Sequence, residues 1–428
     1  MNFLASGNPP VLTATGGLVR RVSAWMRRAP PEGRAEAVSA LARAYLVSPL
    51  SEGERGEAIL ALTGALDDSS SIVRRALAEA FASAAQAPRH IMIALAHDHS
   101  DIARIVLARS PALTDAELVD CVATSDSPCQ IAIARRPALR AGPAAALAEL
   151  GDAAAGVALA ANLDADLDGY ALRRLFERFA EDGRVREAML TRPDLPASLR
   201  ADIAAETAKA LAAFASDCQW LAPRRAERIA REAREQAIAV IAAESGAADL
   251  SRLVAHLRAS GALTIALLLR SLMSGDFGLF GRALAELSGL PDKRTASFLA
   301  DPRGGGFAAA YLKAGLPAPF LPAIRAALIE LREGAPKADQ MSHTLVMRTI
   351  RACEKLRDPA LAPVLSLLWS FAGESAREEA RLFTDDEAFS FDAPAQPALA
   401  LTIEAEAVGD FAPSVEIDYA DAPMAAAA

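Results

Sequence analysis

Aromatic side chains and cysteines are scarce in this chain of 428 residues. Phe, Trp and Tyr make up 5% of it and runs of β-branched residues are rare, which argues against β-strands and for an all-α fold. The four cysteines form no Cys-x-x-Cys pair and no metal-binding spacing. We therefore expect reduced, buried thiols in a cytoplasmic protein, with no metal site and no cofactor.

Long apolar runs are absent too. No stretch reaches the roughly 18 apolar residues that a membrane-spanning helix needs, and the N-terminus has no apolar run that ends in a cleavage site. Residues 18–28 do form a short basic amphipathic pattern, with Leu18, Val22, Trp25 and Met26 on one face. A peripheral membrane contact is one interpretation. We favour an ordinary first helix that packs on the chain, because so short a stretch binds membranes weakly.

Basic residues are missing from the C-terminal end. Residues 384–428 contain ten acidic residues and no Lys or Arg. Their charge and their prolines predict an acidic disordered tail. Apolar residues between the acids favour ordering on a recruited partner, and docking on the chain's own helices is the alternative.

The remaining chain is nearly neutral, with 44 acidic residues against 45 Lys and Arg. Within it, the segment 68–205 holds 15 Arg against 19 acidic residues. Proteins that bind nucleic acids usually show the opposite balance. The charge distribution therefore argues against nucleic acid as the partner.

The chain does contain a repeat of 26 to 30 residues between 68 and 205. Its copies share a slot at a helix end, occupied by Phe81, Pro111, Pro137, Leu163 and Pro193. Eleven residues before each slot stands a residue that favours a helix N-cap: Ser70, Ser100, Asp126, Asp152 and Asp182. An apolar stripe with helical spacing lies between cap and slot. The pattern predicts stacked helical hairpins, an α-solenoid, because no hairpin could bury its apolar face alone.

The rest of the chain divides by composition around this repeat. We expect a flexible arm with a short helix (1–30), the repeats (31–205), a helical C-terminal half (206–335), a terminal helical pair (336–383) and the tail (384–428).

Several runs resemble the bacterial family called domain of unknown function 2336, over about residues 65–332. They are Leu107-Ala-Arg-Ser-Pro-Ala-Leu-Thr-Asp-Ala-Glu-Leu118, Ile133-Ala-Arg-Arg-Pro-Ala-Leu139, Thr191-Arg-Pro-Asp-Leu195, Leu263-Thr-Ile-Ala-Leu-Leu-Leu-Arg270, Gly289-Leu-Pro291 and Gly315-Leu-Pro317. The resemblance implies HEAT-like helices and no established activity. It therefore implies no catalytic residue.

Other motifs in the chain are incomplete as catalytic sites. His97-Asp98 could suggest a metal site, but Asp68 holds the same place in the preceding copy, so Asp98 belongs to the turn of the repeat. Asp276-Phe-Gly278 and Gly304-Gly-Gly306 lack the other parts of a kinase or phosphate-binding loop.

HEAT-like folds include DNA glycosylases, which grip an extruded base with aromatic side chains. Between 68 and 205 there is no Trp and one Tyr, Tyr170.

A set of arginines gives the candidate binding site. Arg74, Arg104 and Arg186 recur seven residues before the slot, and Arg109 and Arg135 stand nearby. We expect all five to be largely exposed and to contact an acidic segment of a protein partner. The sequence thus predicts a non-enzymatic protein–protein interaction scaffold. A nucleic-acid-acting, glycosylase-like protein is the alternative.

Overall fold

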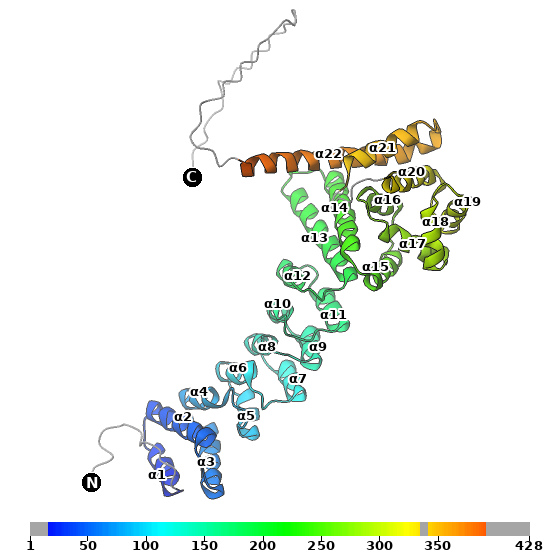
Figure 1. Cartoon of the computed structure of the whole chain (residues 1–428). Helices are drawn as coiled ribbons and strands as arrows, with labels where there is room; N and C mark the ends of the chain where they lie inside the picture. Colours follow the sequence, from blue (N-terminus) through cyan, green and yellow to red (C-terminus); the bar gives the residue numbers. More distant parts are fainter. Residues whose placement is uncertain (1–15, 334–340, 391–428) are drawn as a thin grey trace, which may run out of the picture. The chain divides into compact units, whose positions relative to one another are not determined.

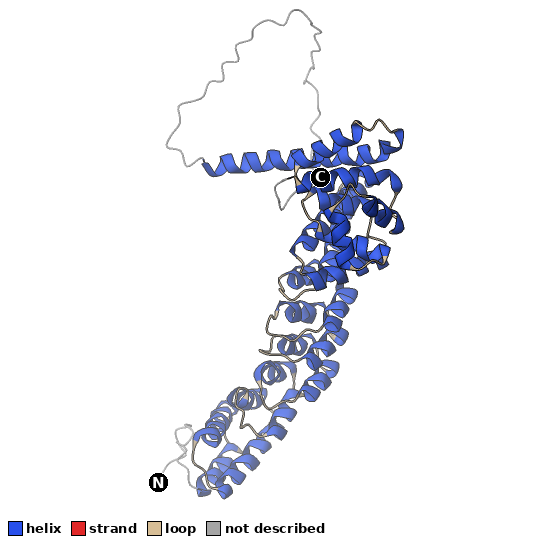
Figure 2. Ribbon diagram, turned by 45° about the vertical axis from the view of Figure 1, so that its right-hand side comes forward, coloured by secondary structure: helices blue, strands red, loops and turns tan. Residues whose placement is uncertain are grey.

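The computed structural model describes residues 16–333 and 341–390, the last eight of them by their backbone alone. These residues form 22 α-helices and three 3₁₀ helices, and no strand occurs among them (Figure 2). The predicted all-α class is confirmed. Within the described ranges, no helix has the length and apolar character needed to cross a membrane.

The first helices form a small packed group. They are α1 (Gly16–Met26), α2 (Pro31–Val47), α3 (Glu52–Gly64) and the 3₁₀ helix η1 (Ala65–Asp67). Helix α1 packs on α2 and α3, Val22 is buried, and the Trp25 ring covers Gly33 so closely that an added Cβ would lie 3.2 Å from it. The apolar face of α1 is therefore used inside the protein, although the side chain of Leu18 lies outside those described. The predicted arm is helical from residue 16, and residues 1–15 lie outside the description.

The repeats fold as paired helices. They are α4 (Ser71–Phe81), α5 (Arg89–Ala96), α6 (Ser100–Arg109), α7 (Asp115–Thr124), α8 (Ser127–Ala134), α9 (Ala141–Leu150), α10 (Ala153–Ala161), α11 (Gly169–Phe179) and α12 (Gly183–Leu190). Helices α4, α6, α8, α10 and α12 pack each on the next, as do α7, α9 and α11 (Figure 1). One apolar core cluster runs through them from residue 19 to 203. The second helices of the copies therefore lie side by side, as the spacing predicts.

Three of the predicted helix caps are confirmed. The carboxylates of Asp126, Asp152 and Asp182 accept backbone N–H bonds from the first turns of α8, α10 and α12, at 3.3, 2.8 and 2.9 Å. Such bonds satisfy donors that have no partner inside a helix. Local chemistry alone was enough to place these helix starts.

The helix starts predicted near Ser70 and Ser100 are confirmed, but neither side chain makes the predicted cap bond. Ser70 is the N-cap residue of α4 and makes no side-chain cap bond, and its backbone N–H donates to Asp68 at 2.8 Å. Helix α6 begins at Ser100 itself, with His99 as the capping position. The hydroxyl of Ser100 donates instead to Asp126 in the next copy. In both turns the serine therefore donates a hydrogen bond to an aspartate instead of capping a helix.

The C-terminal half is built on a second apolar core, from residue 197 to 372. Its elements are α13 (Ala197–Asp217), α14 (Pro223–Glu244), α15 (Ala247–Ala259), α16 (Ile265–Met273), α17 (Gly278–Ser288), α18 (Asp292–Ala300), α19 (Gly305–Lys313), η2 (Ala318–Phe320), α20 (Leu321–Arg332), α21 (His343–Glu354), η3 (Pro359–Leu361) and α22 (Ala362–Ser390). Gly289 and Gly315 take positive φ angles of 66° and 71° just after α17 and α19. Each Gly-Leu-Pro motif is thus a left-handed helix end followed by a Pro that opens the next turn.

The predicted start of the tail at 384 is wrong. Helix α22 continues to Ser390, because residues 376–382 are strong helix formers and no Pro interrupts the chain before Pro394. By its contacts the chain divides into two units after Ser375, within α22. The predicted tail beyond residue 390 lies outside the described residues.

Candidate functional site

In the last three copies, the residue before the slot joins neighbouring copies of the repeat. Arg136 donates from Nη1 and Nη2 to the carbonyl oxygens of Leu107 and Ser110, at 2.6 and 2.7 Å. Asn162 in the next copy donates to the carbonyl oxygens of Ala134 and Arg136, at 2.8 and 2.7 Å. Leu107 and Ala134 lie in the last turns of α6 and α8, where carbonyl oxygens lack a partner within the helix, and Ser110 and Arg136 lie just beyond the helix ends.

Arg192 continues the same column one copy further. It is buried and donates to the carbonyl oxygens of Asn162 and Ala165, at 2.7 and 3.2 Å. We call Arg136, Asn162 and Arg192 the slot donors. The sequence showed these residues at one position of the repeat, but their long reach into the preceding copy was not predicted. A polar donor directly before the slot in these three copies is the signal that could have revealed them.

Arg74 and Arg186 are half-buried, so the expectation that they are largely exposed is wrong. Arg74 forms a two-pronged ion pair with Asp98, at 2.7 and 3.1 Å, and donates to the Asp68 carbonyl oxygen at 2.6 Å. Arg186 donates to the Ala180 carbonyl oxygen at 2.6 Å. Both side chains bind the turn that leads into their own helix, and they stabilise the repeat.

The same position holds a buried glutamine in the third copy. Gln130 donates to the Val122 carbonyl oxygen at 3.0 Å and accepts from the Asp152 N–H at 3.3 Å. This side chain therefore repeats the contact to the incoming turn without a charge. Three positions of the column that was predicted as a basic binding ridge, Arg74, Gln130 and Arg186, thus have structural roles, whereas Arg104 of the same column is exposed.

The other three predicted arginines are exposed. Arg104 lies 3.3 Å from Asp101 on its own helix, which Arg75 also approaches at 3.9 Å. Arg109 ends α6 and Arg135 follows α8 at the equivalent position. Because α6 and α8 pack side by side, the structure brings Arg109 and Arg135 to matching ends of neighbouring helices. Arg104 lies five residues before Arg109, which places it roughly 140° away around the helix. Arg104 therefore does not belong to this pair.

No ion pair joins Arg109 or Arg135 to another described residue. These two guanidinium groups stand among repeats in which acidic residues outnumber arginines. Arginine is suited to recognise a carboxylate through two parallel hydrogen bonds. The pair is therefore what remains of the predicted site.

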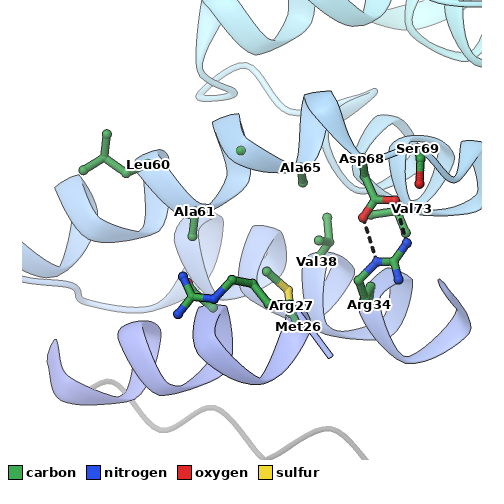
Figure 3. A pocket seen from close by; sticks show the side chains of 12 residues that line it. Met26, Arg27, Arg34, Val38, Leu60, Ala61, Ala65, Asp68, Ser69 and Val73 are labelled. Carbon is green, nitrogen blue, oxygen red and sulfur yellow. Dashed lines mark hydrogen bonds and ion pairs between the residues drawn. The ribbon is translucent and has the colours of Figure 1, made fainter. Parts of the chain in front are cut away.

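A cavity of about 490 Å³ lies between α1, α2 and α3 (Figure 3). Met26 and Val38 supply apolar lining, and the guanidinium groups of Arg27 and Arg34 are its cations. Every nitrogen of Arg34 already donates: Nε and Nη2 to Asp68 at 2.7 and 2.8 Å, and Nη1 to the Ala29 carbonyl oxygen at 2.9 Å. The ion pair forms part of the cavity wall, and the charge of Arg34 is already matched by Asp68.

The histidines near the repeat turns have partners within the protein. His90 hydrogen bonds to the Thr63 hydroxyl at 2.8 Å, and His97 contacts the Ile93 carbonyl oxygen at 3.0 Å. Asp98 accepts from the His99 N–H and from Arg74, as Asp68 does from Ser70 and Arg34. Asp98 therefore has the turn role that the repeat predicts.

Three of the four cysteines are buried and one is not. Burial raises the pKa of the Cys121 and Cys353 thiols to about 11 and that of Cys129 to about 12, which keeps them protonated and unreactive at neutral pH. Cys218 is exposed, so the expectation of four buried thiols is wrong. It follows α13 at the end of the α13–α14 hairpin, where the surrounding residues are exposed as well.

That hairpin carries a surface that the sequence interpretation missed. The sequence predicts a helical C-terminal half from residue 206, and the apolar residues Leu211, Phe214 and Trp220 were not singled out. All three are exposed. The available signal was the three-residue spacing of Leu211 and Phe214 within an Ala-rich helix, followed closely by a Trp.

Comparison with known proteins identifies the family. No curated protein and no solved structure matches the chain. The family model described as "Uncharacterised protein conserved in bacteria (DUF2336)" matches residues 102–358. The match starts in α6, later than the resemblance at about 65 suggested, and extends through α21. It covers well over half of the sequence, and the chain therefore belongs to the DUF2336 family of bacterial proteins.

Proposed function

We propose that this protein is a non-enzymatic scaffold that binds an acidic segment of a protein partner on its helical repeats. The observation that supports this function is the pair Arg109 and Arg135, exposed at matching ends of α6 and α8. Two guanidinium groups on neighbouring, mutually fixed helices can hold carboxylates of one extended segment. The free thiols support a cytoplasmic location.

Charge reversal of the pair tests this function. Arg109→Glu with Arg135→Glu should remove the partners that the wild-type chain captures, as identified by mass spectrometry. Capture by the wild type should weaken with added salt, because salt screens exposed charges. The matched control is Arg43→Glu with Arg332→Glu, which reverses two exposed arginines outside the site. Unchanged capture by the Arg109 and Arg135 variant would refute the proposed site.

The same protein preparation distinguishes the alternative function. A nucleic-acid-acting protein should bind duplex DNA with an affinity that falls steeply as salt rises. We expect no such binding from the wild-type chain. DNA binding that the double charge reversal weakens would favour the nucleic-acid alternative over the scaffold.

A further inference from the structure

The α13–α14 hairpin stands clear of the core at one end. Its base is held by buried side chains, including Leu199 and Ile203 on α13 and Ile238 and Ile241 on α14. From residue 204 to 234 only Ala226 is buried. The segment that joins the two helices, residues 218–222, is therefore the free end of the hairpin.

Large apolar side chains gather toward this free end. Leu211 is 63% exposed, Phe214 56%, Trp220 71% and Ile229 41%. Phe214 and Trp220 meet edge to face with ring centres 5.5 Å apart, and Leu211 shares a helix face with Phe214 because they are three residues apart. Single exposed apolar residues are ordinary, but a cluster of this kind marks an interaction site.

The free half of the hairpin is also basic. Between 204 and 234 there are six basic residues and four acidic ones: Lys209, Arg224, Arg225, Arg228, Arg231 and Arg234 against Glu206, Asp217, Glu227 and Glu232. Lys209 is paired with Glu206 at 3.2 Å. Arg224 and Arg225 lie in the first turn of α14, where the helix dipole disfavours positive charge. Helix stability does not explain their position beside the exposed Trp220, whereas an anionic ligand does.

The shape of the surface indicates the kind of partner. A cavity of about 610 Å³ runs along the hairpin, lined by Lys209, Ala212, Pro223 and Ala230 among others, and none of the exposed apolar residues lines it. Leu211, Phe214 and Trp220 thus lie outside this cavity, exposed toward the free end of the hairpin. Such an end suits a flat surface better than a peptide.

We infer that the free end of the α13–α14 hairpin binds an anionic membrane surface. Trp220, Phe214 and Leu211 enter the boundary between headgroups and acyl chains, where amphipathic aromatic rings are favoured. Arg224 and Arg225 face the lipid phosphates, which attract basic residues near the surface. The scaffold would then meet its protein partner on the repeats and the membrane on this hairpin.

Tryptophan fluorescence of the full chain provides the test. The chain has three Trp residues, so Trp25→Phe with Trp369→Phe leaves Trp220 as the single reporter. The probes are vesicles of phosphatidylcholine alone and of phosphatidylcholine mixed with phosphatidylglycerol. With the mixed vesicles we expect a blue shift of Trp220 emission and co-sedimentation of the protein, both decreasing with salt.

Two variants address the contacts separately. In the wild-type background, Phe214→Ser with Trp220→Ser should abolish co-sedimentation. Arg224→Glu with Arg225→Glu should weaken binding to the mixed vesicles by at least roughly 30-fold, from the typical contribution of two basic residues near an anionic surface. The controls are Leu312→Ser and the Arg43→Glu, Arg332→Glu pair, which change exposed residues elsewhere. Both should bind like the wild type, and circular dichroism confirms that each variant is folded.

Three outcomes would overturn the inference. The first is no blue shift and no co-sedimentation with mixed vesicles. The second is binding that the hairpin variants leave unchanged. The third is a dimer in light scattering that Trp220→Ser dissociates, because the apolar end would then be covered by a second copy. The Arg109→Glu, Arg135→Glu variant should still bind vesicles, so a failure of the scaffold function is distinguishable from a failure here.

Discussion

Arg136 shows how one side chain can hold two copies of the repeat together. Its guanidinium group donates to two carbonyl oxygens at the end of α6, and its own carbonyl oxygen accepts from Asn162. Burial lowers the pKa of Arg136, yet an arginine stays charged at any physiological pH. Its neighbour Arg135 is exposed and in no ion pair with the described residues. Adjacent arginines therefore differ in role.

Replacing Arg136 should destabilise the fold. Arg136→Ala leaves two helix-end carbonyls without a donor, and hydrogen bonds from a charged donor contribute about 1.5–3 kcal/mol each. We expect a loss of about 2–4 kcal/mol in the free energy of unfolding, measured by urea titration. Arg135→Ala is the matched control and should change it by less than about 0.5 kcal/mol. Equal losses at the two positions would contradict the role of the slot donors.

Asp68 should make stability depend on pH in the acidic range. The hydrogen bond from Arg34 lowers the pKa of Asp68 in the folded state, so the unfolded chain takes up the proton first as pH falls. This contribution is present above the unfolded pKa of about 3.9 and is lost as pH falls through the lower folded value. Unfolding measured against pH should show Asp68→Asn less stable than wild type at neutral pH, with the difference shrinking below about pH 4. Glu187→Gln, at an exposed position, should show no such convergence.

At the scale of the element, the sequence predicts those helix boundaries that depend on contacts between residues close in the chain. The starts of α8, α10 and α12 were predictable because Asp126, Asp152 and Asp182 bind N–H groups two or three residues away. The structural use of Arg74 was not, because its partner Asp98 belongs to the next copy. The exposed end of the α13–α14 hairpin was not predicted for a related reason. Nothing in a helical pattern says which helices lack a neighbour.

The neighbouring helices α6 and α8 allow a direct comparison of a helix cap with a core residue. Asp126→Ala should cost about 1 kcal/mol through loss of the N-cap. Leu107→Ala on the neighbouring helix α6 should cost about 2–5 kcal/mol, because Leu107 is fully buried and its truncation leaves a cavity. Thermal or urea unfolding of the two variants measures both. Small and equal effects would show that these residues do not have the assigned places in the hairpin.

At the scale of the molecule, two apolar cores meet in α13. Ile203 belongs to the first core and Ala197 and Ala201 to the second. Asp202 lies between them, and its carboxylate accepts from Arg173 of α11 and contacts His256 of α15, both at 2.7 Å. One carboxylate thus connects the repeats to the C-terminal half.

Asp202→Ala should weaken the coupling between the halves. Residues in one hydrogen-bonded network typically show coupling energies of about 0.5–3 kcal/mol. Trp25 reports on the repeats, and Trp220 and Trp369 report on the rest. Single-Trp variants should unfold at closer urea midpoints in the wild-type background than in the Asp202→Ala background. Midpoints that stay equally close in both backgrounds would show that Asp202 does not link the halves.

The slot donors have a consequence for how such a chain can change its length. Their acceptors are backbone carbonyls, which every copy offers whatever its side chains are. Between copies, each donor reaches the copy before it, as in other arrays governed by nearest neighbours. After a copy is duplicated or deleted, the donor at the new junction would therefore still find an acceptor carbonyl. We therefore expect a copy with a slot donor to tolerate the insertion or deletion of a preceding hairpin without a compensating substitution.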